Sequence, residues 1–169
     1  MYTLVIVLRL LHILGGVIWV GGALSVNFFV GPAVGATGES GKQFVGYLMN
    51  RTRFTAAMTV GALTTVIAGF LLYGIDSSWF SSAWESSGPG IGFAIGALFA
   101  LVGFVTGIMN GNNNRALGRI GAQIQGKPTG EQAAQLDKIR KQQAWVVPVN
   151  SYSLLLAVFF MAIARYLRI

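Results

Sequence analysis

The sequence contains four stretches of mostly apolar residues, each long enough to cross a lipid bilayer as an α-helix. The hydrocarbon core of a bilayer is about 30 Å thick, which a helix spans with about 20 residues. Backbone polar groups inside the hydrocarbon must be satisfied by the segment itself, which favours helices. We therefore predict an all-α fold, a membrane-spanning antiparallel four-helix bundle. The stretches are residues 4–30, 54–75, 91–109 and 146–164.

The composition agrees with a membrane protein and excludes several classes of function. Only 10% of the 169 residues are charged, whereas soluble domains carry about 25%. The length fits one domain, so we treat residues 1–169 as a single integral membrane domain. The chain has no cysteine, which excludes disulfides, zinc–thiolate sites and haem attached through cysteine. All five acidic residues lie outside the apolar stretches, so no paired-carboxylate site is expected within the membrane.

Lysine and arginine residues are concentrated in two connecting segments, which predicts the orientation of the chain. Residues 31–53 hold three and residues 110–145 hold six, together nine of the 12, whereas residues 76–90 hold none. Because basic loops stay on the cytoplasmic side of a bacterial cell membrane, we expect both termini to lie outside. The basic residues are expected to contact anionic membrane lipid. No aromatic interleaving accompanies them, so nucleic acid is not expected as a partner.

The two basic segments are expected to differ in structure. We predict that residues 31–53 form a loop. Residues 110–145 are predicted as a partly helical cytoplasmic segment, in which residues 111–114 end the third membrane helix. Thr129 or Gly130 is then expected to cap a helix that continues into the fourth stretch, because strong helix formers follow.

Small and polar residues in the third and fourth stretches predict how the helices associate. In lipid, helices associate through close packing and hydrogen bonds rather than through hydrophobic burial, and small residues allow close approach. Asn150 and Ser153 share one face and are expected to bond across the bundle. Glycines at four-residue intervals form a ridge that is expected to contact another helix of the bundle or of a second copy. They are Gly92, Gly96, Gly103, Gly107 and Gly111.

The first apolar stretch carries its strongly polar groups on one face. At about 100° per residue, Arg9, Gly16, Trp19 and Asn27 fall within about 60° of His12 on the helix. An ionisable side chain near the bilayer centre costs about 2.5–3.5 kcal/mol on insertion scales, so such residues usually face the bundle interior. We therefore expect this stripe to face a sheltered centre formed with the other three helices.

His12 is the single histidine and the candidate metal ligand. A neutral imidazole can bind haem iron or copper, relay protons, or hydrogen-bond to a neighbouring helix. The spacing favours haem b, because Gly16 leaves room for a flat macrocycle, Trp19 can stack at its edge, and Arg9 can pair with a propionate. Copper is less expected, since only methionines remain to complete its ligand set. A structural or proton-handling His12 stays open as the alternative.

The sequence leaves the second axial position of such a haem open. The position is vacant, is taken by Met161, or is taken by His12 of a second copy across a twofold axis. The last arrangement would place the haem between subunits. We expect a homo-oligomer or a subunit of a larger membrane complex.

Three segments in the first half of the chain carry a family resemblance. Leu11-His12, Trp19-Val20-Gly21-Gly22 and Gly31-Pro32-Ala33 resemble the opening helix of the CopD-like superfamily of bacterial membrane proteins, named for copper resistance D and including the HemJ-like proteins. Further similarity is found at the ends of the second helix and in the last helix. The segments there are Arg51-Thr52-Arg53-Phe54, Ala68-Gly69 and Ala164-Arg165-Tyr166-Leu167.

The resemblance implies a four-helix membrane protein in which His12 contacts haem or copper. HemJ-like proteins are implicated in oxidising protoporphyrinogen and pair this histidine with a lysine in a later helix, but the apolar stretches here contain no lysine. Copper-resistance relatives carry more methionine and histidine on the outer face. These differences favour a haem b-binding subunit that transfers electrons or has an accessory role. The alternatives are a cofactor-free structural or assembly subunit and a transporter of copper or a small solute.

Overall fold

The computed structural model describes residues 2–124 and 126–168, which are helical apart from short turns. The predicted all-α fold is confirmed. Four helical stretches are long and apolar enough to cross a membrane, so the chain is a membrane-embedded helical protein. The elements are α1 (Tyr2–Ser25), the π-helix η1 (Val26–Val30), α2 (Gly31–Thr37), α3 (Glu39–Arg51), α4 (Phe54–Asp76), α5 (Ser82–Glu85), α6 (Gly88–Gln123), α7 (Gly130–Ile163) and the 3-10 helix η2 (Ala164–Tyr166).

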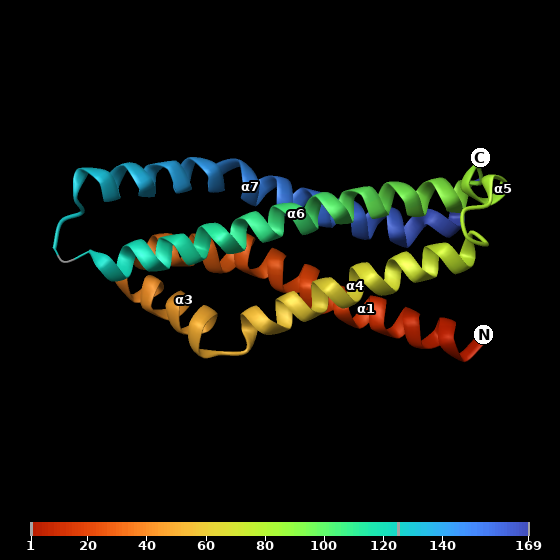
Figure 1. The fold of residues 1–169 in the computed structure, drawn as a ribbon, viewed down its shortest axis with the longest axis horizontal. Helices are drawn as coiled ribbons and strands as arrows, with labels where there is room; N and C mark the ends of the chain where they lie inside the picture. The colour runs from red at the N-terminus through yellow and green to blue at the C-terminus, as the bar shows by residue number, and fades with distance from the viewer. Residues whose placement is uncertain (1, 125, 169) are drawn as a thin grey trace.

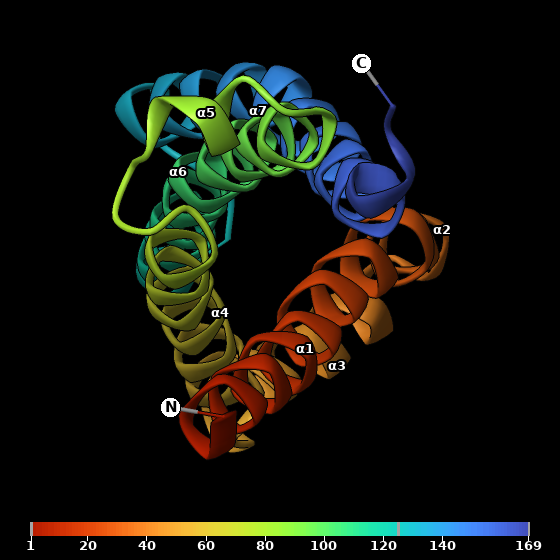
Figure 2. The same ribbon diagram turned by 90° about the vertical axis from the view of Figure 1, so that its right-hand side faces the viewer.

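The long helices form two pairs. Helix α1 packs along α4, and α6 packs along α7, with far less contact between the pairs. The chain runs away from the N-terminal end in α1, returns in α4, leaves again in α6 and returns in α7, so both termini lie at one end (Figure 1). The end view shows the two pairs arranged around a common axis (Figure 2).

The prediction of a loop over residues 31–53 is wrong, because α2 and α3 occupy this segment. The first helical stretch runs without a break from Tyr2 to Thr37. Pro32 lies in the first turn of α2, directly after the π-helix η1, and such local changes of hydrogen-bonding pattern allow a membrane helix to accept proline. The reversal into α3 occurs at Gly38, whose φ of +58° favours glycine.

The prediction that residues 111–114 end the third helix is also wrong, because α6 continues to Gln123. Glycine costs a helix about 1 kcal/mol relative to alanine, and asparagine costs less. Contacts with α7 offset this cost. Gln143 of α7 donates hydrogen bonds to the side-chain oxygens of Asn114, at 2.7 Å, and Asn110, at 3.4 Å.

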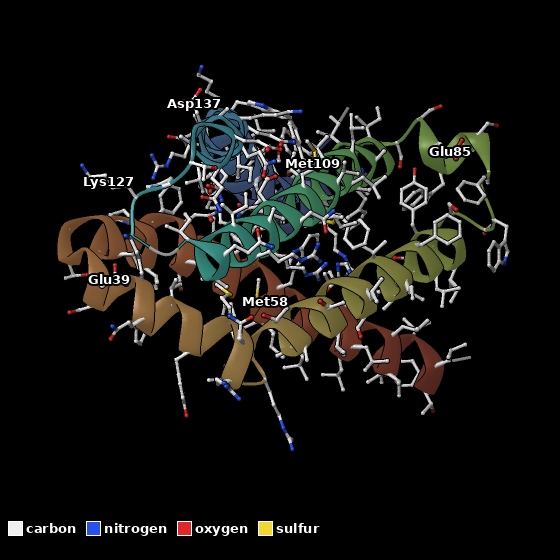
Figure 3. All side chains as sticks on the ribbon, turned by 60° about the vertical axis from the view of Figure 1, so that its left-hand side comes forward. Glu39, Met58, Glu85, Met109, Lys127 and Asp137 are labelled. Carbon is white, nitrogen blue, oxygen red and sulfur yellow. The ribbon has the colours of Figure 1, made fainter. Side chains whose placement is uncertain are left out.

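The turn between α6 and α7 lies at the end of the bundle opposite the termini (Figure 1). Thr129 caps α7 there, since its hydroxyl accepts a hydrogen bond from the backbone N–H three residues on and a capping box is complete. Figure 3 shows Glu39, Lys127 and Asp137 at this end, whereas Glu85 lies at the end that carries the termini.

The glycine ridge of α6 contacts α7 of the same chain. A Cβ atom added at Gly92 would lie 2.8 Å from the Cα of Ala164, and one added at Gly103 would lie 2.6 Å from a methyl carbon of Leu154. These approaches leave no room for larger side chains. At Gly111, in contrast, an added Cβ would meet no atom within 4 Å, so this glycine is not part of the contact.

Two sets of side chains join the helix pairs near the middle of the bundle. Asn27 of η1 donates hydrogen bonds to Asn150 Oδ1, at 3.2 Å, and to Ser151 Oγ, at 2.9 Å, both on α7. The bond from Asn27 is thus the cross-bundle bond expected of Asn150, which also donates to the backbone oxygen of Gly103 within its own helix pair, at 2.7 Å. Among the described residues no such bond is found for Ser153. The second set consists of Trp19, Phe104, Ala62 and Leu154, which pack together.

Candidate functional site

A cavity of about 670 Å³ lies between the two helix pairs, in the half of the bundle that carries both termini. Its volume is within the range of about 300–1,000 Å³ that small-molecule and cofactor sites occupy. All four long helices and α5 contribute to the lining, which is mainly apolar. The lining side chains that carry a polar or sulfur atom are Arg9, His12, Trp19, Thr65, Tyr73, Asp76, Trp84, Met161 and Arg165.

Three members of the polar stripe of α1 line this cavity, namely Arg9, His12 and Trp19. Gly16 does not take part. A Cβ added there would lie 3.7 Å from Thr65 Cγ2, an ordinary contact distance, so Gly16 faces α4 rather than leaving room in the cavity. Asn27 also lies outside the lining and belongs to the hydrogen bonds that join the helix pairs.

The imidazole of His12 is oriented by a hydrogen bond to α4. Its Nδ1 lies 2.8 Å from the backbone oxygen of Thr65. A carbonyl oxygen only accepts, so Nδ1 carries the proton and donates, and Nε2 of the neutral ring keeps its lone pair. A histidine that ligates a metal almost always donates its other ring N–H to such an acceptor. The arrangement therefore prepares Nε2 to act as a base or a ligand.

Gly69 of α4 makes room for this ring. A Cβ added at Gly69 would lie 2.7 Å from Cε1 and 2.9 Å from Nδ1 of His12, so any larger residue there would displace the imidazole. Gly69 belongs to the site although its own sequence context carries no chemical signal. Its role depends on which turn of α4 faces His12, and that pairing is a property of the folded bundle.

Charged residues gather at the terminal end of the cavity. Arg9 pairs with Asp76 at the end of α4, with 3.9 Å between Nη2 and Oδ2. Both side chains are partly exposed, at 43% and 32%, so the pair contributes no more than about 1 kcal/mol. Arg165 of η2 lines the same end. Among the side chains that line the cavity, two arginines against one carboxylate give a net positive charge, which suits the acidic group of a ligand, and Glu85 of α5 lies at the same end of the bundle.

Aromatic side chains form much of the wall near this end. The rings of Tyr73 and Trp84 meet edge to face, with centroids 5.1 Å apart, and Trp84 stacks on Phe93 with centroids 6.4 Å apart. Towards the middle of the bundle, Trp19 is buried and meets Phe104 edge to face at 6.0 Å. Aromatic side chains therefore line the cavity both near the terminal end and towards the middle of the bundle.

The lining of the cavity offers few side chains that could ligate a metal ion. Across residues 2–124 and 126–168, no three or more histidine, cysteine, aspartate or glutamate side chains gather where they would hold a metal ion. A bare copper ion would have to rely on His12 and Met161, which both line the cavity. Haem iron already has four macrocycle nitrogens and needs one or two axial donors from the protein.

The fold and the cavity define a helical membrane protein with a mostly apolar interior site that carries one free imidazole nitrogen and two arginines. Compared with protein-family models, curated proteins and solved structures, the chain gives no match. The likeness to the CopD-like superfamily therefore stays a prediction from the helix motifs.

Proposed function

We propose that the protein binds haem b in this cavity, with His12 Nε2 as an axial ligand of the iron, and transfers electrons within the membrane. The observation that carries the proposal is the hydrogen bond from His12 Nδ1 to Thr65, which leaves Nε2 as the available donor at an apolar cavity. When bound, haem b supplies the one-electron redox couple of its iron.

The other lining residues fit the shape and charge of this cofactor. The macrocycle is flat and apolar, which suits a lining that contains Phe93, Trp84 and Trp19, whereas its two propionates are anionic. Arg9 and Arg165 at the terminal end are suited to pair with them, because guanidinium groups bind carboxylates through paired hydrogen bonds. Arg9 would then share its charge between Asp76 and a propionate.

We also propose that the protein lies in a bacterial cell membrane. Nine of the 12 basic residues lie in segments 31–53 and 110–145, which supports an orientation with both termini outside. The cavity would then lie in the outer half of the bilayer. The CopD-like resemblance of the first helix agrees with this arrangement.

The test uses the full chain, expressed with haem available and purified in mild detergent. We expect the Soret and α/β absorption bands of a bound haem in the wild type. His12→Ala should remove them, and imidazole added to that variant should restore them by filling the space left by the side chain. Leu11→Ala, at an exposed neighbour on the same helix, is the matched control and should keep the wild-type spectrum.

Two results would contradict the proposal. The first is a folded wild type that takes up no haem, which would favour the cofactor-free structural subunit in which His12 only joins α1 to α4. The second is a wild-type spectrum in His12→Ala without added imidazole, since the haem would then be held by another residue.

A further inference from the structure

Resting on the proposed function, we infer that Met161 of α7 is the second axial ligand of the iron, so that the two helix pairs each supply one donor. Met161 and His12 line the same cavity, one from α7 and one from α1. A thioether sulfur is a common partner of histidine at haem iron and raises the reduction potential.

The contacts between helices place the two side chains at the same depth in the bundle. Trp19 of α1 meets Phe104 of α6, which fixes the register of these two helices, and both run in the same direction (Figure 1). His12 lies seven residues before Trp19, and Ala97 lies seven residues before Phe104, a rise of about 10 Å in each helix. Ala97 also lines the cavity and is thus level with His12.

Met161 is tied to this level by the glycine ridge. A Cβ added at Gly96 would lie 3.2 Å from both Cγ and Cε of Met161, so the methionine packs directly against α6 at the residue next to Ala97. His12 and Met161 therefore contribute to the cavity at one depth from opposite helix pairs. This is the relation that two axial ligands of one iron require.

The arginines repeat the same pattern. Arg9 lies three residues before His12 in α1, and Arg165 lies four residues after Met161, so each arginine is about one turn nearer the terminal end than the donor on its own helix. Each helix thus presents a donor at the depth of the iron and a cation at the depth of a propionate.

The other donors of the lining are less suited to the position. Tyr73 and Asp76 both lie on α4, in the same helix pair as His12, and nearer the terminal end than Gly69, which contacts the His12 ring. Tyr73 packs against Trp84, and Asp76 pairs with Arg9. Met161 remains as the donor from the α6–α7 pair at the depth of His12.

The experiment compares ferric spectra and midpoint potentials of haem-loaded full-length variants. In the wild type we expect low-spin iron with the weak far-red absorption that methionine sulfur gives with ferric haem. Met161→Leu should lose that absorption and become high-spin, because one axial position empties. Met161→His should stay low-spin, lose the absorption and shift to a lower potential. Met58→Leu, a methionine that packs on Gly22 and does not line the cavity, should match the wild type.

The spectra distinguish a protein that binds no haem from one that binds haem without Met161 as a ligand. A wild type that binds no haem refutes the proposed function. A haem-loaded wild type that is high-spin refutes Met161 as ligand and leaves the second axial position vacant. A Met161→Leu variant that keeps the wild-type low-spin spectrum also refutes Met161 and leaves His12 of a second copy as the donor. If Met161→Leu does not fold, an unchanged wild-type spectrum in Met161→His overturns the inference by itself.

Discussion

At the scale of single residues, the orientation of His12 depends on two groups of α4. The backbone oxygen of Thr65 accepts the Nδ1 proton, and Gly69 leaves the space in which the ring lies. The Thr65 hydroxyl donates to the backbone oxygen of Gly61 at 2.7 Å and lies 3.4 Å from the backbone oxygen of His12, so the imidazole bond itself is accepted by the main chain of Thr65. Substitution of the Thr65 side chain would therefore leave the acceptor of His12 in place.

Gly69→Ala tests the fit of the ring directly. The added Cβ would lie 2.7 Å from His12 Cε1, closer than real carbon contacts allow, so the imidazole must move. Overpacking of this kind costs about 1–3 kcal/mol, and we expect haem binding to weaken by about 5- to 150-fold, measured by haem titration followed at the Soret band. Gly21→Ala is the control, because nothing lies within 4 Å of its added Cβ. Equal affinity in the two variants would contradict the packing described for Gly69.

The sequence was sufficient to select Arg9, His12 and Trp19, because the 3.6-residue period places them on one face of a helix whose ionisable groups avoid lipid. Gly69 and Arg165 were not predicted as site residues. Their contribution depends on which turns of α4 and α7 lie opposite α1, and periodicity within one helix carries no information on the register between helices.

At the scale of the elements, Asn150 joins three helices. Its side chain accepts from Asn27 of η1 and donates to Gly103 and Thr106 of α6, while itself belonging to α7. The residue is 2% exposed, so its own amide cannot exchange these partners for water. The π-helix that carries Asn27 follows directly on α1, and single π-helical turns within longer helices are frequent at functional sites.

Asn150→Ala should lower the free energy of unfolding in detergent by about 1–2 kcal/mol, because polar groups on η1 and α6 lose their partner. Thermal or denaturant unfolding followed by circular dichroism measures this change. Asn112→Ala on exposed α6 surface controls for the higher helix propensity of alanine and should leave the stability unchanged or slightly increased. A loss of stability no greater than in Asn112→Ala would contradict the role of Asn150.

The extent of the elements was predicted less well than their type. Apolar length identified four spans, but α6 and α7 pair well beyond the apolar residues, through side-chain amides such as Gln143 and Asn114. The glycines and asparagines of residues 111–114 signal a turn in isolation, and tertiary hydrogen bonds override that signal. Residues 31–53 were misjudged because Gly38 alone makes the reversal between two helices.

At the scale of the whole molecule, two helix pairs meet in the middle and separate towards the termini, which forms the cavity. Trp19, Phe104 and Asn27 hold the pairs together at mid-bundle. The all-α class followed from the physics of the bilayer, since each long apolar segment has to satisfy its own backbone. The cavity could not be predicted from the sequence, because its volume depends on how the two helix pairs pack against each other.

Reporter fusions test the orientation of the whole molecule. Both termini lie at one end of the bundle (Figure 1). The basic segments 31–53 and 110–145 include Glu39 and Lys127, which lie at the opposite end (Figure 3). We expect a periplasm-active reporter fused after the C-terminal residue to be active and the same reporter inserted at Lys127 to be inactive. The reverse pattern would show that the cavity opens towards the cytoplasm and that the charge rule fails here.

The most direct measurement of the central claim uses the fact that the chain has one histidine. Haem-loaded protein labelled with ¹⁵N only in histidine can be measured by pulsed electron paramagnetic resonance of the ferric state. If His12 binds the iron, we expect a ¹⁵N hyperfine coupling of the size found for a directly bound imidazole, and His12 alone gives rise to it. A haem signal without any histidine ¹⁵N coupling would contradict ligation by His12.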